Sequence, residues 1–337
     1  MKKVIFVVDD SINNLTMIAE ALNPHYAVKT IPTGEEAIAL LEKVKPNLIL
    51  LDIEMLGMDG FDVLKHLKDN HKYKDIPVIF LTAKDDFSTE IEALELGVTD
   101  FIAKPFNPAV LLNRINHHIG ASELLRERIL QLHKAKQDII FVLADMIENR
   151  DEETGDHLWR TSSLIKDLLK QMLISRVYYD QISEWDFDLI AECSLLHDVG
   201  KINTPDSILN KPGKLTPEEW EIMKAHTIIG GKIIQKIIDR SGENEFLRNS
   251  KIFAEAHHER WNGSGYPYGL KGDSIPLQGR IMAIVDVYDA LISKRVYKDA
   301  FSLEQALEFI LEEKGKHFDP QIVDVFLDII EQVNQDM

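Results

Sequence analysis

The sequence predicts an α/β domain with a doubly wound parallel sheet, followed by an all-α domain. Over residues 1–120, short runs rich in β-branched residues alternate with amphipathic helical segments. After about residue 141 the pattern is helical and contains no convincing strand. The chain has 337 residues, 45% hydrophobic and 28% charged, which is enough for two or three domains with their own cores. We therefore expect domains over residues 1–120 and 143–337, joined by a helical connector over residues 121–142.

Five runs in the first domain are expected to be strands of one parallel sheet with helices on both faces. They are residues 4–8, 26–31, 47–53, 77–83 and 99–104. Ser11 and Thr33 precede helical segments and are suited to act as N-caps. In a doubly wound sheet, ligands bind where the carboxyl ends of the strands meet. We expect a functional site at that edge.

Composition restricts the partners and the compartment. The formal charge of −18 argues against direct DNA binding, which needs Lys and Arg spread over a face or along a recognition helix. The single cysteine excludes an internal disulfide and fits a reducing compartment. The N-terminal apolar run stops at Asp9 and is too short for a signal peptide, and no run has the length of a membrane span. We expect a cytoplasmic protein that does not enter the membrane.

Polar residues gather at the predicted carboxyl ends of the strands. Asp9 and Asp10 close the first strand, Asp52 the third, Thr82 the fourth and Lys104 the fifth. Three converging carboxylates repel one another unless a cation neutralises them, and hard oxygen ligands suit Mg²⁺. A carboxylate beside a metal, a hydroxyl and an ammonium can accept a phosphoryl group, because the cations balance the new charge.

The first third of the chain resembles the receiver domain of two-component response regulators, which has a flavodoxin-like fold. The resemblance is carried by the run LLDIEMLGMDG, by Thr82 and by the triplet KPF. It implies a cognate sensor histidine kinase as partner and Mg²⁺ as the receiver cofactor. The residues that it implies are Asp52 as phosphoacceptor, Asp9 and Asp10 as Mg²⁺ carboxylates, Thr82 as switch hydroxyl, Phe101 as aromatic switch and Lys104 as phosphate contact.

The connector contains a weak heptad seam. Its apolar positions are four and three residues apart, with an interruption at Lys136. They are Leu125, Ile129, Leu132, Ile139 and Leu143. The spacing favours a homodimer that pairs along this helix, and the alternative is one helix of a single-chain bundle.

Potential metal ligands recur through the second domain, several of them beside turns. The run HHERWNGSGYP begins with His257 and His258, which are expected to point in different directions and so to serve separate metals. Asp198 follows an apolar helix end, and a carboxylate in that position can bridge two metals. The potential ligands are Glu153, His157, His197, Asp198, His226, His257, His258 and Asp286.

The second domain resembles the HD-GYP subclass of the HD-superfamily metal-dependent phosphohydrolases, over about residues 143–326. The runs HDVGKI, HHERWNGSGYPYGLKG and IPLQGRIMAIVDVYDALISKRVYK carry the resemblance. It implies that His197, Asp198, His226, His257, His258 and Asp286 hold two metals, with Asp198 bridging. Glu153 and His157 match the positions that provide a third metal site in some members. Iron or manganese is the family expectation, although His and carboxylate ligands do not exclude zinc.

The resemblance also implies roles around the substrate. Lys201 would act beside Asp198 in catalysis, by binding phosphate or by assisting the leaving group. Arg295 and Lys298 would bind the substrate phosphates, and Tyr266 would lie against a guanine base. Gly263, Gly265 and Pro267 would let the backbone pass close to the substrate and fix the direction of the tyrosine.

The resemblance implies a phosphorylation-regulated hydrolase of cyclic di-GMP. A hydroxide activated by the metals would open the ring to linear pGpG, with further cleavage to GMP left open. Two alternatives are the same chemistry on another cyclic dinucleotide, such as 3'3'-cyclic GMP-AMP, and a non-catalytic signalling adaptor. Missing ligands would favour the adaptor, and none of the motif ligands is missing.

Overall fold

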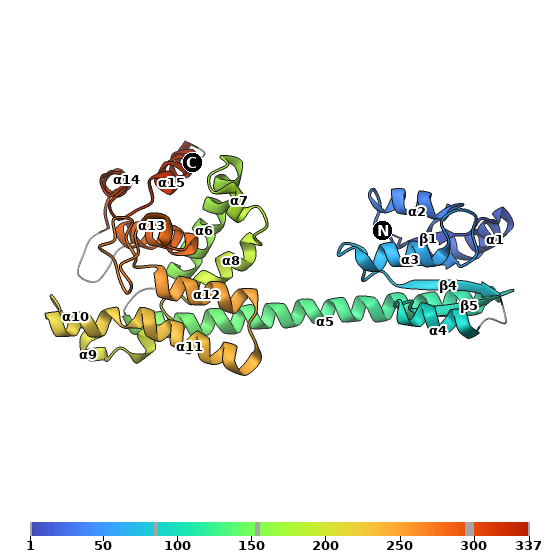
Figure 1. Ribbon diagram of the computed structural model, residues 1–337, viewed down its shortest axis with the longest axis horizontal. Helices are drawn as coiled ribbons and strands as arrows, with labels where there is room; N and C mark the ends of the chain where they lie inside the picture. The colour runs from blue at the N-terminus through green and yellow to red at the C-terminus, as the bar shows by residue number, and fades with distance from the viewer. Residues whose placement is uncertain (1, 84–86, 152–155, 294–299, 336–337) are drawn as a thin grey trace. The chain divides into compact units, whose positions relative to one another are not determined.

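The computed structural model describes residues 2–83, 87–151, 156–293 and 300–335. The chain divides into two compact units, residues 1–132 and 133–337. Helix α5 (Pro108–Glu148) contributes residues to both units, and the predicted connector falls within it (Figure 1). In the described part of the chain, no helix is both long and apolar enough to cross a membrane.

The first unit contains a five-stranded parallel sheet with the strand order β2-β1-β3-β4-β5. The predicted strands are confirmed to within one residue at each end. Their bounds are β1 (Val4–Val8), β2 (Ala27–Ile31), β3 (Leu48–Asp52), β4 (Val78–Ala83) and β5 (Asp100–Lys104). The order changes direction at β1, between β2 and β3, which is where such sheets bind ligands.

Helices cover both faces of this sheet because alternate side chains of each strand point to opposite sides. Phe6 and Val8 pack with α2 (Gly34–Leu41), α3 (Gly60–Asp69) and α4 (Phe87–Glu95). Ile5 and Val7 pack with α1 (Ile12–Leu22) and the first part of α5. The predicted N-caps are confirmed, since the Ser11 and Thr33 side chains accept hydrogen bonds from backbone amides of the following helices. The doubly wound α/β fold is therefore confirmed.

The second unit is helical, as predicted. Among its described residues there is no strand, and one β-bridge joins Lys314 to Phe318. Its α-helices are α6 (Asp156–Ile174), α7 (Tyr179–Ile182), α8 (Phe187–Ser194), α9 (Asp206–Leu209), α10 (Pro217–Lys224), α11 (His226–Ser241), α12 (Glu245–Ala256), α13 (Leu277–Ile292), α14 (Leu303–Glu312) and α15 (Pro320–Gln335). Short 3₁₀ helices are η1 (Asn149–Asp151), η2 (Val199–Asn203) and η3 (Gly272–Ser274).

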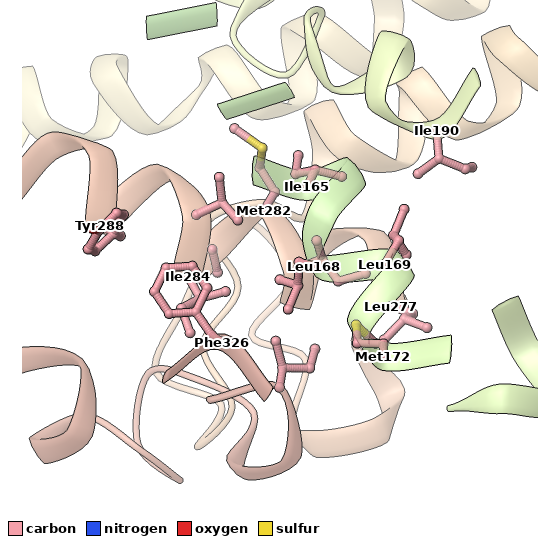
Figure 2. Packing of buried hydrophobic residues seen from close by; sticks show 14 of the residues in the cluster. Ile165, Leu168, Leu169, Met172, Ile190, Leu277, Met282, Ile284, Tyr288 and Phe326 are labelled. Atoms are coloured by element: carbon pink, nitrogen blue, oxygen red, sulfur yellow. The ribbon is translucent and has the colours of Figure 1, made fainter. Parts of the chain in front are cut away.

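Helix α13 lies in the centre of the second core. Every residue from Leu277 to Val285 is buried, so the helix is covered on all sides rather than along one stripe. The buried face of α6 and Phe326 of α15 pack against it (Figure 2). Tyr288 meets the Phe326 ring edge-on, with centroids 5.0 Å apart. The packing of α13 therefore fixes the position of the side chains in its carboxyl-terminal half.

Helices α12 and α13 approach closely at Gly279. A Cβ atom at this position would lie 2.7 Å from both the Cβ atom and the carbonyl oxygen of Ala256. Contacts this short cannot be accommodated by rotating a flexible side chain, because one partner is backbone. Glycine is therefore required for this helix pair to pack as it does.

Gly279→Ala should destabilise the helical unit by about 1–3 kcal/mol through overpacking against Ala256. Gly120→Ala is the matched control, because Gly120 is exposed on α5 and an added Cβ would meet no atom within 4 Å. That variant should be neutral or more stable by up to about 1 kcal/mol through helix propensity. Thermal unfolding followed by circular dichroism measures both. A Gly279→Ala variant that melts with the wild-type protein would contradict the close packing.

Candidate metal centre

Four predicted ligands of the second unit converge into one group, which we call the first ligand group: Asp198, His226, His257 and His258. One ligand atom from each lies within 4.8 Å of the others. All four lie at helix ends, where the regular hydrogen-bond pattern stops and side chains can turn inward. Asp198 precedes η2, His226 begins α11, and His257 caps the C-terminus of α12.

The expected separation of His257 and His258 is not observed. Their ring centroids lie 4.1 Å apart with the planes inclined by 44°. His257 keeps right-handed helical dihedrals. The side chains of His257 and His258 are therefore related by one helical step, whereas in a strand they would point to opposite sides. Both rings therefore reach the first ligand group from adjacent positions.

The histidines are oriented through their Nδ1 atoms. Nδ1–H of His197 donates to the Ser194 carbonyl oxygen at 2.8 Å, and that of His257 to the Phe253 carbonyl at 2.9 Å. His226 donates to the Met223 carbonyl at 2.7 Å. A carbonyl can only accept, so the proton is on Nδ1 and the Nε2 lone pair faces the site. This is the tautomer that a metal ligand needs.

The converging atoms repel one another unless a cation lies among them. Nε2 of His226 and Nε2 of His257 are 3.3 Å apart, and Asp198 Oδ1 is 3.2 Å from the former and 3.6 Å from the latter. Among the described residues, buried Asp198 Oδ1 has no hydrogen-bond partner. Nitrogen lone pairs and a carboxylate oxygen form the donor set that divalent transition metals prefer. The residues fit a metal ion.

Backbone contact sets the distance between Asp198 and His226. A Cβ atom on Gly200 would lie 1.9 Å from the His226 carbonyl oxygen and 2.6 Å from the Gly230 nitrogen. Only glycine lets η2 lie directly against the start of α11. The side chains of Asp198 and His226 therefore extend from two segments whose backbones are in contact, which brings the two side chains together.

A second ligand group consists of Glu148, His157 and His197, whose ligand atoms also lie within 4.8 Å of one another. His157 Nε2 is 3.8 Å from Glu148 Oε1 and 3.6 Å from Asp286 Oδ1. His197 Nε2 is 3.3 Å from Asp198 Oδ2. Asp198 thus turns one oxygen toward each ligand group. The structure brings His157 close to His197 and Asp286, whereas the resemblance implied that His157 serves a third site with Glu153; Glu148 was not among the predicted ligands.

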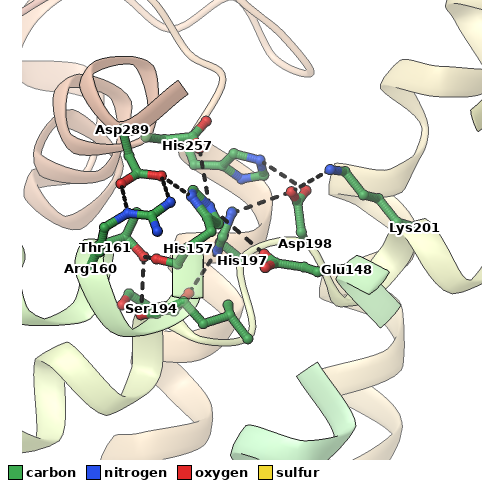
Figure 3. A network of polar contacts seen from close by, with 12 residues as sticks. Glu148, His157, Arg160, Thr161, Ser194, His197, Asp198, Lys201, His257 and Asp289 are labelled. Carbon is green, nitrogen blue, oxygen red and sulfur yellow. Dashed lines mark hydrogen bonds and ion pairs between the residues drawn. The ribbon is translucent and has the colours of Figure 1, made fainter. Parts of the chain in front are cut away.

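Asp289 is a further residue that sequence reasoning missed. His157 Nδ1–H donates to Asp289 Oδ2 at 2.6 Å, and Arg160 donates to both oxygens of the same carboxylate (Figure 3). Asp289 follows Asp286 by three residues on α13, so the two carboxylates share one helix face. That spacing was the available signal. Asp289 fixes the His157 ring in the same tautomer as the other histidines.

Burial and neighbouring charges shift the pKa values of these groups strongly. Burial lowers the pKa of His258 well below its usual range, with His257 and His226 adding to the effect, so this ring is neutral. Burial would also lower the pKa of His197, but Asp198 and the other carboxylates outweigh it and raise the value to about 10. A metal must displace that proton to bind His197 Nε2.

Lys201 lies beside the shared carboxylate. Its ammonium is 2.9 Å from Asp198 Oδ2, and the residue is 9% exposed. Burial alone would raise the pKa of Asp198, but Lys201 and His197 hold it well below its usual range, so the carboxylate stays ionised. A cation in this position can contact an anion that enters the group.

The loop after His258 brings an aromatic ring to the first ligand group. The Tyr266 ring centroid lies 4.8 Å from that of His258 and 6.0 Å from that of Trp220. Gly263 has a positive φ of 86°, and a Cβ on Gly265 would lie 2.6 Å from the His258 carbonyl oxygen. The loop therefore needs glycine to turn and to pass His258. Pro267 follows Tyr266 directly, through a cis peptide bond.

Glu259 holds this loop and was also missed. The residue is 1% exposed, and its carboxylate accepts hydrogen bonds from the backbone amides of Tyr268 and Leu270 at 2.7 and 2.9 Å. Three predicted site residues, Glu153, Arg295 and Lys298, lie outside the described residues.

The predicted carboxylates of the first unit also converge. Asp9, Asp10 and Asp52 place ligand oxygens within 4.8 Å of one another. Lys104 Nζ lies 2.9 Å from Asp9 Oδ2 and 2.7 Å from Asp52 Oδ2, and Thr82 lines the same pocket. Burial raises the pKa of Asp52, an effect that Lys104 opposes. Phe101 is half-buried on β5 and meets the Phe80 ring edge-on at 6.1 Å.

Comparison with known proteins identifies both domains. The family model described as HD domain matches residues 142–322, and that described as response regulator receiver domain matches residues 5–116. A probable cyclic di-GMP phosphodiesterase of Vibrio cholerae is 40% identical, over 98% of this chain and 78% of its own. The cyclic di-GMP phosphodiesterase response regulator RpfG of Xanthomonas campestris is 35% identical, over 96% of this chain and 86% of its own.

A relative named for a different substrate matches a shorter stretch. The 3'3'-cGAMP-specific phosphodiesterase 2 of Vibrio cholerae is 38% identical, over 65% of this chain and 39% of its own. The two ligand groups lie within the residues matched by the HD domain model. Asp9, Asp10 and Asp52 lie within those matched by the receiver model. The chain belongs to the family of response regulators in which a receiver domain precedes a cyclic-dinucleotide phosphodiesterase of the HD type.

Proposed function

We propose that this protein hydrolyses cyclic di-GMP to linear pGpG in its helical unit, under the control of Asp52 phosphorylation. The observation that carries the proposal is the placement of Asp198 between the two ligand groups, with one oxygen toward each. Three relatives named for cyclic di-GMP match nearly the whole chain, which supports this substrate.

The residues divide the chemistry among them. When bound, divalent metals in such a centre lower the pKa of a shared water and polarise the phosphodiester. Asp198 and the imidazoles of the two ligand groups would hold the metals, with Asp286 and His157 on the side of the second ligand group. The Lys201 ammonium contacts a phosphate oxygen or the leaving oxygen. Burial raises the pKa of Tyr266, so its hydroxyl keeps its proton and can donate to the substrate.

The metals are proposed to be iron or manganese, two or three in number. Glu153 is proposed to add a carboxylate to the second ligand group. Arg295 and Lys298 are proposed to contact the substrate phosphates, and Tyr266 is proposed to stack on a base, with Gly263, Gly265 and Pro267 fixing its loop.

The same chemistry on 3'3'-cyclic GMP-AMP is the second candidate. A relative named for that substrate is 38% identical over 65% of this chain. A relative named for cyclic di-GMP is 42% identical over a similar share, 64% of this chain, and two others named for cyclic di-GMP extend over both units. We therefore rank cyclic di-GMP first, and both nucleotides belong in the same assay.

Control by phosphorylation is proposed to pass through α5 in a homodimer. The predicted seam positions Leu125, Ile129, Leu132, Ile139 and Leu143 are all exposed on this helix. A row of exposed apolar residues at heptad spacing favours pairing with a second copy.

A cognate histidine kinase would supply the phosphoryl group to Asp52. Mg²⁺ held by Asp9, Asp10 and Asp52 would neutralise the charge, while Thr82, Phe101 and Lys104 would respond to it.

Replacement of both His197 and Asp198 by alanine should reduce hydrolysis of cyclic di-GMP more than about 10³-fold, because each ligand group loses a donor. Products from cyclic di-GMP and 3'3'-cyclic GMP-AMP are separated by chromatography, and bound metal is measured on the same samples. His133→Ala, on the exposed face of α5, is the control and should match the wild-type protein. Undiminished turnover by the double variant would rule out the assigned centre.

Asp289→Asn should weaken metal binding about 10–100-fold, because the neutral amide no longer stabilises the His157 tautomer as an anion does. Ser293→Ala is the matched control, since the Ser293 hydroxyl accepts from Arg160 and donates to Asp289 at 3.4 Å, whereas the charge of Asp289 and its hydrogen bond with His157 stay in place. Metal affinity measured by competition with a chelator distinguishes the two variants. Equal affinities would mean that Asp289 does not orient the ligand.

Asp52→Ala should abolish any change in phosphodiesterase activity on treatment with acetyl phosphate or a beryllofluoride mimic, because the acceptor oxygen is removed. The activity of the untreated variant should remain measurable, since Asp52 lies in the other unit. The assay compares treated and untreated samples of both proteins. A variant that still responds would show that the signal enters elsewhere.

A further inference from the structure

Glu148 is a buried carboxylate without a hydrogen-bond partner. The residue is 2% exposed, and neither side-chain oxygen has a partner among the described residues. A buried carboxylate is normally paired with a cation or accepts several hydrogen bonds, because desolvation without compensation is costly. The ion-pair contact of Glu148 is with His157 Nε2 at 3.8 Å, which is longer than a hydrogen bond, so the position of this carboxylate suits a positive ion held between the two side chains.

The carboxylate faces two imidazole nitrogens. Glu148 Oε1 lies 3.8 Å from His157 Nε2, too far for a hydrogen bond, and its ligand atoms are within 4.8 Å of those of His157 and His197. Two ligands each about 2.1 Å from one ion lie about 3–4 Å apart, depending on the coordination geometry. The separation therefore fits two ligands of one ion. The Nδ1 atoms of both histidines already donate to Asp289 and Ser194, so the Nε2 atoms are the ring nitrogens left to bind an ion.

The backbone around Glu148 is fixed to the metal-binding part of the chain. Glu148 ends α5, and Arg150 of η1 donates to the carbonyl oxygens of Lys201, Ile202 and Thr204 at 2.9–3.2 Å. These carbonyls belong to η2 and its C-cap, which follow Asp198 directly. The glutamate is therefore held at a set distance from the shared carboxylate of the centre.

We propose that Glu148 is a metal ligand, which binds one ion together with His157 and His197. The proposal rests on the proposed function only in requiring a metal centre, and it names a carboxylate that the sequence motifs do not supply. It does not depend on Glu153, which lies outside the described residues. Helix α5, whose first residues pack on the sheet of the first unit, thus ends in a residue of the metal centre.

The test is the number of ions bound by full-length protein. Metal-free wild-type and Glu148→Gln proteins are dialysed against graded Mn²⁺, and bound metal is measured by mass spectrometry. Glutamine keeps the size of the side chain but removes the charge. Glu148→Gln should bind one ion fewer, or bind its weakest ion at least about tenfold less tightly. Glu148→Asp, which keeps the charge on a shorter chain, should fall between the two.

Glu192→Gln is the matched control. Glu192 is a partly buried glutamate of α8 in the same unit, and it pairs with Lys136 rather than with histidines. This variant should bind metal as the wild-type protein does. Thermal unfolding adds a readout independent of activity: without metal, Glu148→Gln should melt at or above the wild-type temperature, because a buried unpaired charge is lost. Added Mn²⁺ should raise the melting temperature of the wild-type protein more than it raises that of Glu148→Gln.

Two results would overturn the assignment. One is a Glu148→Gln variant with wild-type metal number and affinity, and the other is a wild-type protein that binds no divalent metal. A Glu148→Gln variant that melts below the wild-type protein in both states would indicate a structural role instead. The outcome is separable from the proposed function, because a wild-type protein that binds metal through Glu148 but cleaves no cyclic dinucleotide would refute only the hydrolysis.

Discussion

The Asp198 carboxylate is the contact on which the centre of the helical unit depends. One oxygen faces His226 and His257, and the other faces His197 and Lys201. In a buried site, lone pairs and negative charges at these separations repel strongly because little water screens them. Lys201 offsets part of that repulsion on one side of Asp198, and protons or metal ions among the imidazoles can offset the rest. The protein folds its helices around a set of groups that are mutually unfavourable without a bound cation.

Helix ends and close backbone contacts create this arrangement. The ligands come from the end of α5, the start of α6, the segment after α8, the start of α11, the end of α12 and the carboxyl-terminal half of α13. Gly200 lets η2 touch the start of α11, and Gly279 lets α13 approach α12. The apolar core around α13 holds these segments in place, so the geometry of the centre depends on packing far from any ligand.

Local patterns predicted the elements well, because they depend on neighbours in the sequence. Short runs rich in β-branched residues located the strands, and Ser11 and Thr33 marked helix starts. The site was predictable only where a motif contains its ligands. Glu148 precedes His157 by nine residues, a spacing with no helical or strand periodicity, so only the tertiary fold reveals that they meet. The convergence of His257 and His258 depends on helical dihedrals at the end of α12, which a turn-rich sequence does not disclose.

The acceptors of the histidine Nδ1 atoms differ in kind. Those of His197, His226 and His257 are main-chain carbonyls three or four residues earlier in the chain. No side-chain substitution at Ser194, Met223 or Phe253 removes a carbonyl, so the orientation of these three rings is insensitive to single mutations at the acceptor. His157 alone among the four relies on a side chain, Asp289. A single substitution, at Asp289, can therefore change the orientation of His157, whereas no single substitution of an acceptor residue removes the hydrogen bond that orients the other three rings.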